Sequence, residues 1–136
     1  MSPRWPDRSD ADPAPDAPRP TTVLVDRESL YRWFASESLR ACGVDVVCCG
    51  TLGEADAYVD SHPGTALLLV DEPTIRGEGE RGRAILRRLS HAVRCVLFGT
   101  EPDRFVGRPL ALTVVDKPDD FDGLTALVGR QLHLAG

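Results

Sequence analysis

The sequence has no apolar run near the roughly 20 residues that a membrane span needs, and no apolar signal-peptide stretch near its start. Basic residues form no block, because 16 Lys and Arg are scattered among 21 Asp and Glu for a net charge of -5. This balance argues against nucleic-acid binding. We therefore expect a cytoplasmic protein with neither a membrane nor a nucleic acid as its partner.

Metal-binding cysteine patterns are missing too. The four cysteines form no C-x-x-C pair, and three scattered histidines complete no zinc-ligand spacing. We expect the cysteines to be small buried hydrophobic residues in a reducing compartment.

The 136 residues suffice for one domain with a proper core, and 42% of them are hydrophobic. Residues 1–20 hold six of the eleven prolines and little apolar periodicity, so they predict a disordered tail. The ordered domain is then expected over residues 21–136.

Short apolar runs and helical periodicities alternate along this domain. Strands are predicted over 21–25, 44–49, 66–70, 94–98 and 112–115, and helices over 29–42, 51–61, 82–91, 103–106 and 120–132. Alternating βα units imply an α/β fold with a parallel sheet covered on both faces. At this length we expect a flavodoxin-like (βα)5 domain with strand order 2-1-3-4-5.

Three predicted strands end on charged residues: Asp26, Asp71 and the Asp116-Lys117 pair. The carboxyl ends of parallel strands meet at one edge of the sheet, where open α/β sheets place their chemistry. Asp71 is the most informative, because a carboxylate directly follows the apolar run 67–70.

Two further expectations concern packing. The stretch 72–83 is rich in glycine and charge, which favours a solvated loop. Trp33 and Phe34 lie at helical spacing in the first helix, and we expect them in the core rather than on a partner surface.

The order of these motifs resembles the receiver domain of bacterial two-component response regulators. The resemblance covers about residues 21–134 and rests on Val23–Asp26 with Arg32, on Leu68–Asp71, and on Val114–Pro118. It implies that Asp71 is the phosphoacceptor, that Asp26 belongs to an acidic cluster holding Mg²⁺, and that Lys117 pairs with the acceptor or its phosphoryl group. A carboxylate nucleophile and hard oxygen ligands suit these roles.

The sequence also departs from the receiver pattern. Arg27 stands where the family has a second acid, and a guanidinium cannot ligate a cation. The switch hydroxyl of strand four falls on Gly99, with Thr100 one place late, and the aromatic switch of strand five is Val114. We expect Arg27 and Lys117 to neutralise the two carboxylates, so Mg²⁺ is possible but should bind poorly.

The resemblance implies a divergent, single-domain response regulator receiver in a phosphorelay, which is not an enzyme. Its partner would be a sensor histidine kinase or another signalling protein, met by the face of helix four, strand five and helix five. One alternative is a pseudo-receiver, an adaptor or ligand-binding module that works without phosphate. A flavodoxin-like enzyme or nucleotide binder is disfavoured, because Asp26-Arg27-Glu28 replaces a glycine-rich phosphate loop.

Overall fold

The computed structural model describes residues 20–99 and 112–135. Its strands are β1 (Thr21–Val25), β2 (Asp45–Cys49), β3 (Thr65–Asp71), β4 (Arg94–Phe98) and β5 (Leu112–Val115). Its helices are α1 (Ser29–Ala41), α2 (Leu52–Ser61), α3 (Glu72–Ser90) and α4 (Phe121–Ala135). Residues 1–19 of the predicted tail 1–20, the predicted helix 103–106 and Thr100 lie outside the described residues.

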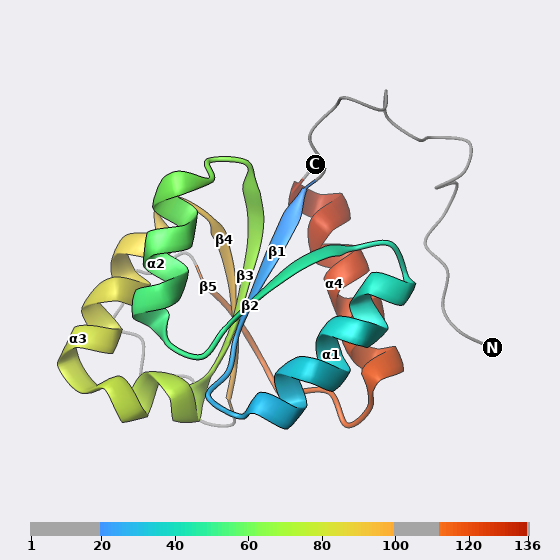
Figure 1. Cartoon of the computed structure of the whole chain (residues 1–136), viewed down its shortest axis with the longest axis horizontal. Coiled ribbons are helices and arrows are strands. Elements are labelled where there is room, and N and C mark those ends of the chain that lie inside the picture. The colour runs from blue at the N-terminus through green and yellow to red at the C-terminus, as the bar shows by residue number, and fades with distance from the viewer. Residues whose placement is uncertain (1–19, 100–111, 136) are drawn as a thin grey trace.

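The five strands form one parallel sheet in the order β2-β1-β3-β4-β5, as predicted. Helices α1 and α4 cover one face of the sheet, and α2 and α3 cover the other (Figure 1). Figure 1 also shows that β1 runs toward the first turn of α1, so the carboxyl ends of the strands gather beside the start of α1 and α4. The predicted flavodoxin-like topology is therefore confirmed.

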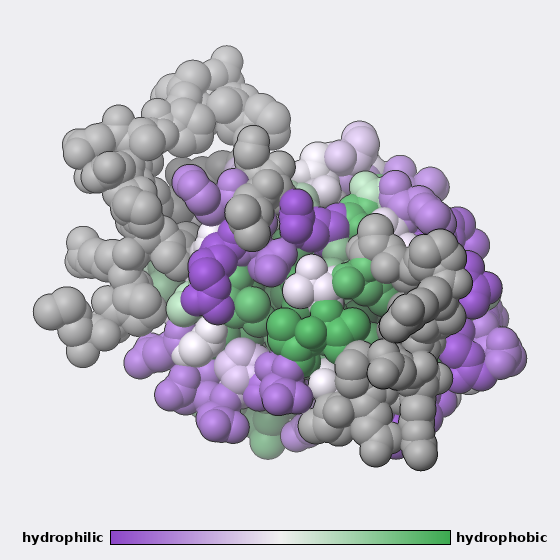
Figure 2. Space-filling model, turned by 180° about the vertical axis from the view of Figure 1, so that it is seen from behind, coloured by the Kyte–Doolittle hydropathy of each residue, from purple (hydrophilic) through white to green (hydrophobic). Residues whose placement is uncertain are grey.

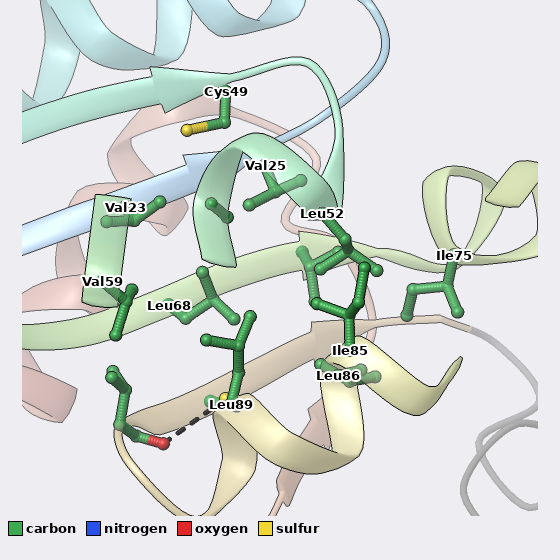
Figure 3. Packing of buried hydrophobic residues seen from close by; sticks show 14 of the residues in the cluster. Val23, Val25, Cys49, Leu52, Val59, Leu68, Ile75, Ile85, Leu86 and Leu89 are labelled. Carbon is green, nitrogen blue, oxygen red and sulfur yellow. Dashed lines mark hydrogen bonds between the residues drawn. The ribbon is translucent and has the colours of Figure 1, made fainter. Parts of the chain in front are cut away.

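Both faces of the sheet bury apolar side chains, because β1, β3 and β4 are flanked by strands on both sides and covered by helices. On one face, Val23, Val25 and Leu68 contact side chains of α2 and α3 (Figure 3). Residues of opposite parity, such as Leu24 and Leu69, point to the α1–α4 layer. This two-faced core fixes the register that positions the strand ends.

The expectation of a loop over residues 72–83 is wrong, because α3 begins at Glu72. Its N-cap is Asp71, whose side chain accepts from the Thr74 N–H, and Ile75 is fully buried. At Gly82 an added Cβ would lie 2.7 Å from the Glu78 side chain and 3.1 Å from a backbone oxygen. Burial of Ile75 in the core, together with the Asp71 cap, thus outweighs the poor helix propensity of the glycines.

Helix α3 is nevertheless interrupted at one point within the segment predicted to be a loop. Gly79 has φ 62° and ψ -145°, which is a conformation that residues with a Cβ rarely adopt. Just before it, the Glu78 side chain accepts a hydrogen bond from the Leu52 N–H at 2.8 Å and ties α3 to the start of α2. The glycine-rich segment is therefore a kinked helix.

The expectation that Trp33 and Phe34 are core residues is also wrong. Leu30, Trp33 and Phe34 are 67%, 57% and 48% exposed, whereas Ala35 and Leu39 carry the packing of α1 against the sheet. The helix is apolar over much of its girth, so periodicity alone did not identify its buried side. We call Leu30, Trp33 and Phe34 the α1 apolar patch.

The β5 side of the sheet is less covered in the described part of the chain. All four residues of β5 are only partly buried. Seen from behind, on the side where β5 forms the sheet edge, hydrophobic residues gather at the centre of the described surface (Figure 2). No helix within residues 20–99 and 112–135 is both long and apolar enough to cross a membrane.

Candidate functional site

Strand alternation brings three predicted site residues onto one face. Asp26, Asp71 and Lys117 each lie two positions after a residue of the core cluster on the α1–α4 side, namely Leu24, Leu69 and Val115. Their side chains therefore start from the same face of the sheet at the carboxyl ends of β1, β3 and β5. This is the juxtaposition that the sequence predicted.

Lys117 joins the two carboxylates. Its Nζ lies 2.9 Å from Asp26 Oδ2 and 3.7 Å from Asp71 Oδ2. Both acids are buried, while the Lys117 side chain is 32% exposed. One ammonium group thus offsets the repulsion between two desolvated carboxylates, which would otherwise be costly.

The second oxygen of Asp71 is held by Thr74. Asp71 Oδ1 accepts from the Thr74 hydroxyl and from the Thr74 N–H at 3.3 Å. The Thr74 hydroxyl oxygen in turn accepts from the Arg27 N–H at 3.0 Å. Thr74 therefore connects the β1–α1 turn to the acceptor candidate through one buried hydroxyl.

Asp26 is fixed by its own turn. The Glu28 N–H donates to Asp26 Oδ1 at 2.8 Å, and the Arg32 guanidinium donates to the Asp26 backbone carbonyl. The Asp26 N–H donates to the Cys49 carbonyl at 3.1 Å and extends the pairing of β1 with β2. These bonds explain how an almost fully buried carboxylate keeps one orientation.

Tyr31 supplies the wall next to Lys117. The Lys117 ammonium lies 3.7 Å from the centroid of the Tyr31 ring, in cation–π geometry. The ring also lies 5.8 Å from Phe121 of α4. Burial, followed by the negative charges of Asp26 and Asp71, raises the pKa of Tyr31 to about 12. The hydroxyl therefore stays protonated at neutral pH.

The surroundings of Asp71 in the folded protein favour its neutral form more than aqueous solution would. Burial is the largest influence and raises the pKa of Asp71, and the nearby Asp26 charge raises it further. The Thr74 hydrogen bonds and the Lys117 charge act in the opposite direction without cancelling the rise. Asp71 is thus a desolvated carboxylate with one ammonium partner, and perturbed carboxyl groups of this kind mark candidate functional sites.

The donor set does not fit a ready-made Mg²⁺ site. Mg²⁺ demands near-octahedral oxygen ligation. Among the described residues, Asp26 and Asp71 are the acids that pair with Lys117, and all four of their carboxylate oxygens contact protein donors. The described residues contain no group of three His, Cys, Asp or Glu side chains that could hold a metal. Lys117 occupies the position between the acids that a cation would need.

The expected pairing of Arg27 with Asp26 or Asp71 is not found. Within the described residues, the ion pairs of both acids run to Lys117. Arg27 is exposed, and its guanidinium lies 3.5 Å from the Cβ position of Gly77 in α3. Its backbone N–H donates to the Thr74 hydroxyl oxygen. In the part of the chain that the structure describes, the neutralising charge comes from Lys117.

The switch positions lie apart from this network. The Gly99 N–H donates to the Val115 carbonyl at 3.0 Å, and Val114 packs as a partly buried residue in β5. A Cβ on Gly99 would lie 2.6 Å from Glu72 Oε2. The Glu72 side chain therefore fills the space that a side chain at position 99 would take.

Sequence reasoning missed Thr74, Tyr31 and Glu72. A sequence signal existed for Thr74, because Asp71-x-x-Thr74 has the spacing of an N-cap acid and its N3 residue. Tyr31 and Glu72 carry no such signal, since their roles depend on neighbours distant in sequence. Expecting a loop after Asp71 hid both Thr74 and Glu72.

Similarity to known proteins is found at the level of structure and not of sequence. No protein-family model matches the sequence, and no curated protein matches it. A response regulator from Thermotoga maritima is similar in structure, with 20% identity, TM-score 0.65, and coverage of 85% of this chain and 99% of that one.

Two further solved structures of receiver domains are also similar to this chain. The beryllofluoride-activated NtrC receiver domain has 22% identity and TM-score 0.66, covering 87% of this chain and 98% of its own. A CheY-like receiver domain from Methanospirillum hungatei has 15% identity and TM-score 0.66, covering 87% and 97%. The chain therefore has the fold of response regulator receiver domains.

Proposed function

We propose that this protein is a divergent signal receiver whose phosphoacceptor is Asp71 and which acts by protein–protein contact. The observation that carries the proposal is the convergence of Asp26 and Asp71 on Lys117 at the carboxyl edge of the sheet. The receiver fold supports this edge as the functional site.

The chemistry assigned to each residue is simple. Asp71 Oδ2 would attack the phosphorus of a phosphohistidine or small phosphodonor, and the bond from phosphorus to the donor would break. The product is an aspartyl phosphate, and the donor leaves with the bonding electron pair. Lys117 lies 3.7 Å from this oxygen and would offset the added negative charge. Asp26 would hold the ammonium in place at 2.9 Å.

Mg²⁺ has no step in this proposal. We infer weak Mg²⁺ affinity, because Lys117 already bridges the carboxylates and Arg27 stands in place of a second acid. The test follows backbone amide shifts of Asp26 and Lys117 during a Mg²⁺ titration. Saturation at sub-millimolar Mg²⁺ would overturn this part of the proposal.

Partner contact fits two surfaces. The face that includes β5 and α4 is the one predicted from the resemblance, and hydrophobic residues gather on the β5 side (Figure 2). The α1 apolar patch is a second candidate, since three large apolar side chains there are about half exposed or more. A sensor kinase or another signalling protein would be the partner, and the thiols of Cys48, Cys49 and Cys95 suit a cytoplasmic setting.

The acceptor is tested by incubating the full chain with acetyl phosphate and measuring intact mass. The expected result is the addition of one phosphoryl group to the wild type and none to Asp71→Asn, which keeps a polar N-cap. Asp120→Asn, at an acid near the start of α4, is the matched control and should still be modified. Equal modification of wild type and Asp71→Asn would refute the assignment.

A pseudo-receiver that works without phosphate is the second candidate, and the Glu72–Gly99 contact favours it. That contact replaces the switch hydroxyl by a carboxylate. Under this alternative, acetyl phosphate would leave the mass unchanged, while partner binding would persist in Asp71→Asn.

A further inference from the structure

Glu72 is a buried carboxylate that the proposed phosphotransfer does not use. It directly follows Asp71 and is only 9% exposed. Its Oε1 pairs with the Arg76 guanidinium one helical turn later, whereas its Oε2 has no hydrogen-bond partner among the described residues. Buried carboxylate oxygens are normally paired, so this one calls for an explanation.

The unpartnered oxygen points to the end of β4. A Cβ on Gly99 would lie 2.6 Å from Glu72 Oε2 and 3.4 Å from Glu72 Cβ. Separations below 3.0 Å are essentially never seen for real Cβ atoms. Serine or threonine at position 99 is therefore incompatible with Glu72 in this rotamer. The two residues are a matched pair, in which the small one makes room for the large one.

Next to Gly99, the Glu72 carboxylate places a hydrogen-bond acceptor where the receiver pattern has a hydrogen-bond donor. By resemblance, position 99 would carry the hydroxyl that hydrogen-bonds the phosphoryl group. A carboxylate accepts hydrogen bonds but cannot donate them, and its charge has the same sign as that of a phosphoryl group. Gly99 follows Phe98, which is the register partner of Asp71 across β3 and β4. The carboxylate thus lies at the strand ends beside the acceptor candidate.

We propose that Glu72 is a specificity-determining residue that disfavours the binding of anions, including phosphoryl groups, at the site beside Asp71. This inference rests on the proposed function for its biological meaning, but the effect on anion binding itself does not require that Asp71 be phosphorylated. Glu72 opposes a bound anion by charge and by volume.

The test compares the full-length wild type with Glu72→Gln, Glu72→Ala and the double variant Glu72→Ala/Gly99→Ser. Glu80→Gln is the matched control, because Glu80 lies on the same helix with its side chain 88% exposed. Inorganic phosphate is titrated at constant ionic strength while the amide shifts of Gly99 and Thr74 are followed. Acetyl phosphate labelling of Asp71 is measured on the same samples, and thermal unfolding checks folding.

We expect Glu72→Gln and Glu72→Ala to bind phosphate at least about tenfold more tightly than wild type, with Glu80→Gln unchanged. The double variant, with a hydroxyl at position 99 and space for it, should bind most tightly. If Glu72→Ala is too unstable, the isosteric Glu72→Gln alone decides the result.

The two proposals fail in different ways. Equal phosphate affinity in wild type and both single variants would overturn the role of Glu72, whether or not Asp71 is labelled. Tighter phosphate binding in the variants with no labelling of any protein at Asp71 would support the role of Glu72 and refute the phosphoacceptor. Faster labelling together with tighter binding in the variants would support both.

Discussion

The ends of β1, β3 and β5 differ from the end of β4, although all four lie at one edge of the sheet. At the first three, Asp26, Asp71 and Lys117 form a closed charge network in which every carboxylate oxygen contacts a donor. At β4 there is no side chain on residue 99, and an unpartnered oxygen of Glu72 fills the space. The site thus has the proposed acceptor Asp71 and its counter-charge, whereas position 99, where the resemblance expects a hydroxyl donor, faces a carboxylate oxygen instead.

The difference between these strand ends concerns two separate requirements, one for accepting a phosphoryl group and one for relaying the resulting signal. A nucleophilic carboxylate needs desolvation and a nearby cation, and Asp71 has both. Relay of a phosphorylation signal needs donors that follow the phosphoryl group, and Gly99 and Val114 offer neither a hydroxyl nor an aromatic ring. Among substitutions outside the apolar core, strong effects are therefore expected in the charge network, with progressively weaker ones away from it.

The largest expected effect comes from removing the bridging cation. Lys117→Met leaves two buried carboxylates without their counter-charge and should lower the free energy of unfolding by about 3 kcal/mol, near the low end for buried pairs because Lys117 is a third exposed. Urea unfolding at pH 7 measures it. In the Asp26→Asn background, which has one carboxylate fewer, Lys117→Met should lower the free energy of unfolding by clearly less than it does in the wild type. A loss below about 1 kcal/mol would mean that solvent, and not Lys117, neutralises the acids.

Next in size is the loss of the buried hydroxyl that joins Asp71 to the β1–α1 turn. Thr74→Val should cost about 1–2 kcal/mol, since it leaves an Asp71 oxygen and the Arg27 N–H each short of a partner. Thr22→Val is the matched control: Thr22 is fully buried, but its hydroxyl has no hydrogen-bond partner among the described residues. That control should be neutral or stabilising. Equal losses at both sites would show that the Thr74 bonds add nothing.

A smaller effect depends on pH. The folded-state pKa of Asp71 is raised, mainly by burial, so its ionised form opposes folding. This penalty is absent below the unfolded pKa of about 3.9 and is complete above the folded pKa. The stability of Asp71→Asn relative to wild type should therefore increase as pH rises through that window. Urea unfolding from pH 4 to 8 measures the difference, and a flat or falling difference would contradict the burial effect.

The smallest effect is expected at the α1 apolar patch. Leu30→Gln should change the free energy of unfolding by less than about 0.5 kcal/mol, because Leu30 is mostly exposed. Leu39→Ala on the buried side of the same helix should cost about 2–5 kcal/mol. Thermal and urea unfolding compare the two. A large loss at Leu30 would show that the patch supports the fold and is not available to a partner.

Much of the fold was predictable from sequence because its signals are local. Apolar runs bounded by turn residues located the five strands. The start of α2 also has a local signal, because Thr51 and Glu54 have the spacing of a capping box and the Thr51 hydroxyl accepts from the Glu54 N–H. The meeting of Asp26, Asp71 and Lys117 followed from parallel topology alone.

The remaining features depend on contacts between distant segments. Glycine-rich residues 72–83 form a helix because Ile75 and Glu78 are held by the core and by α2. Trp33 and Phe34 are exposed because Ala35 and Leu39 take the sheet-facing side of α1. The contact of Glu72 with Gly99 joins residues 27 positions apart, which no local pattern encodes.

The most direct test of the central claim is to locate the acyl phosphate. Wild type and Glu72→Gln are treated with acetyl phosphate, the acyl phosphate is reduced with borohydride, and the modified residue is identified by peptide mapping. We predict that homoserine replaces Asp71 in both proteins, more slowly in the wild type, with Asp26 unmodified. Absence of modification in both proteins, or modification at a carboxylate other than Asp71, would contradict the claim.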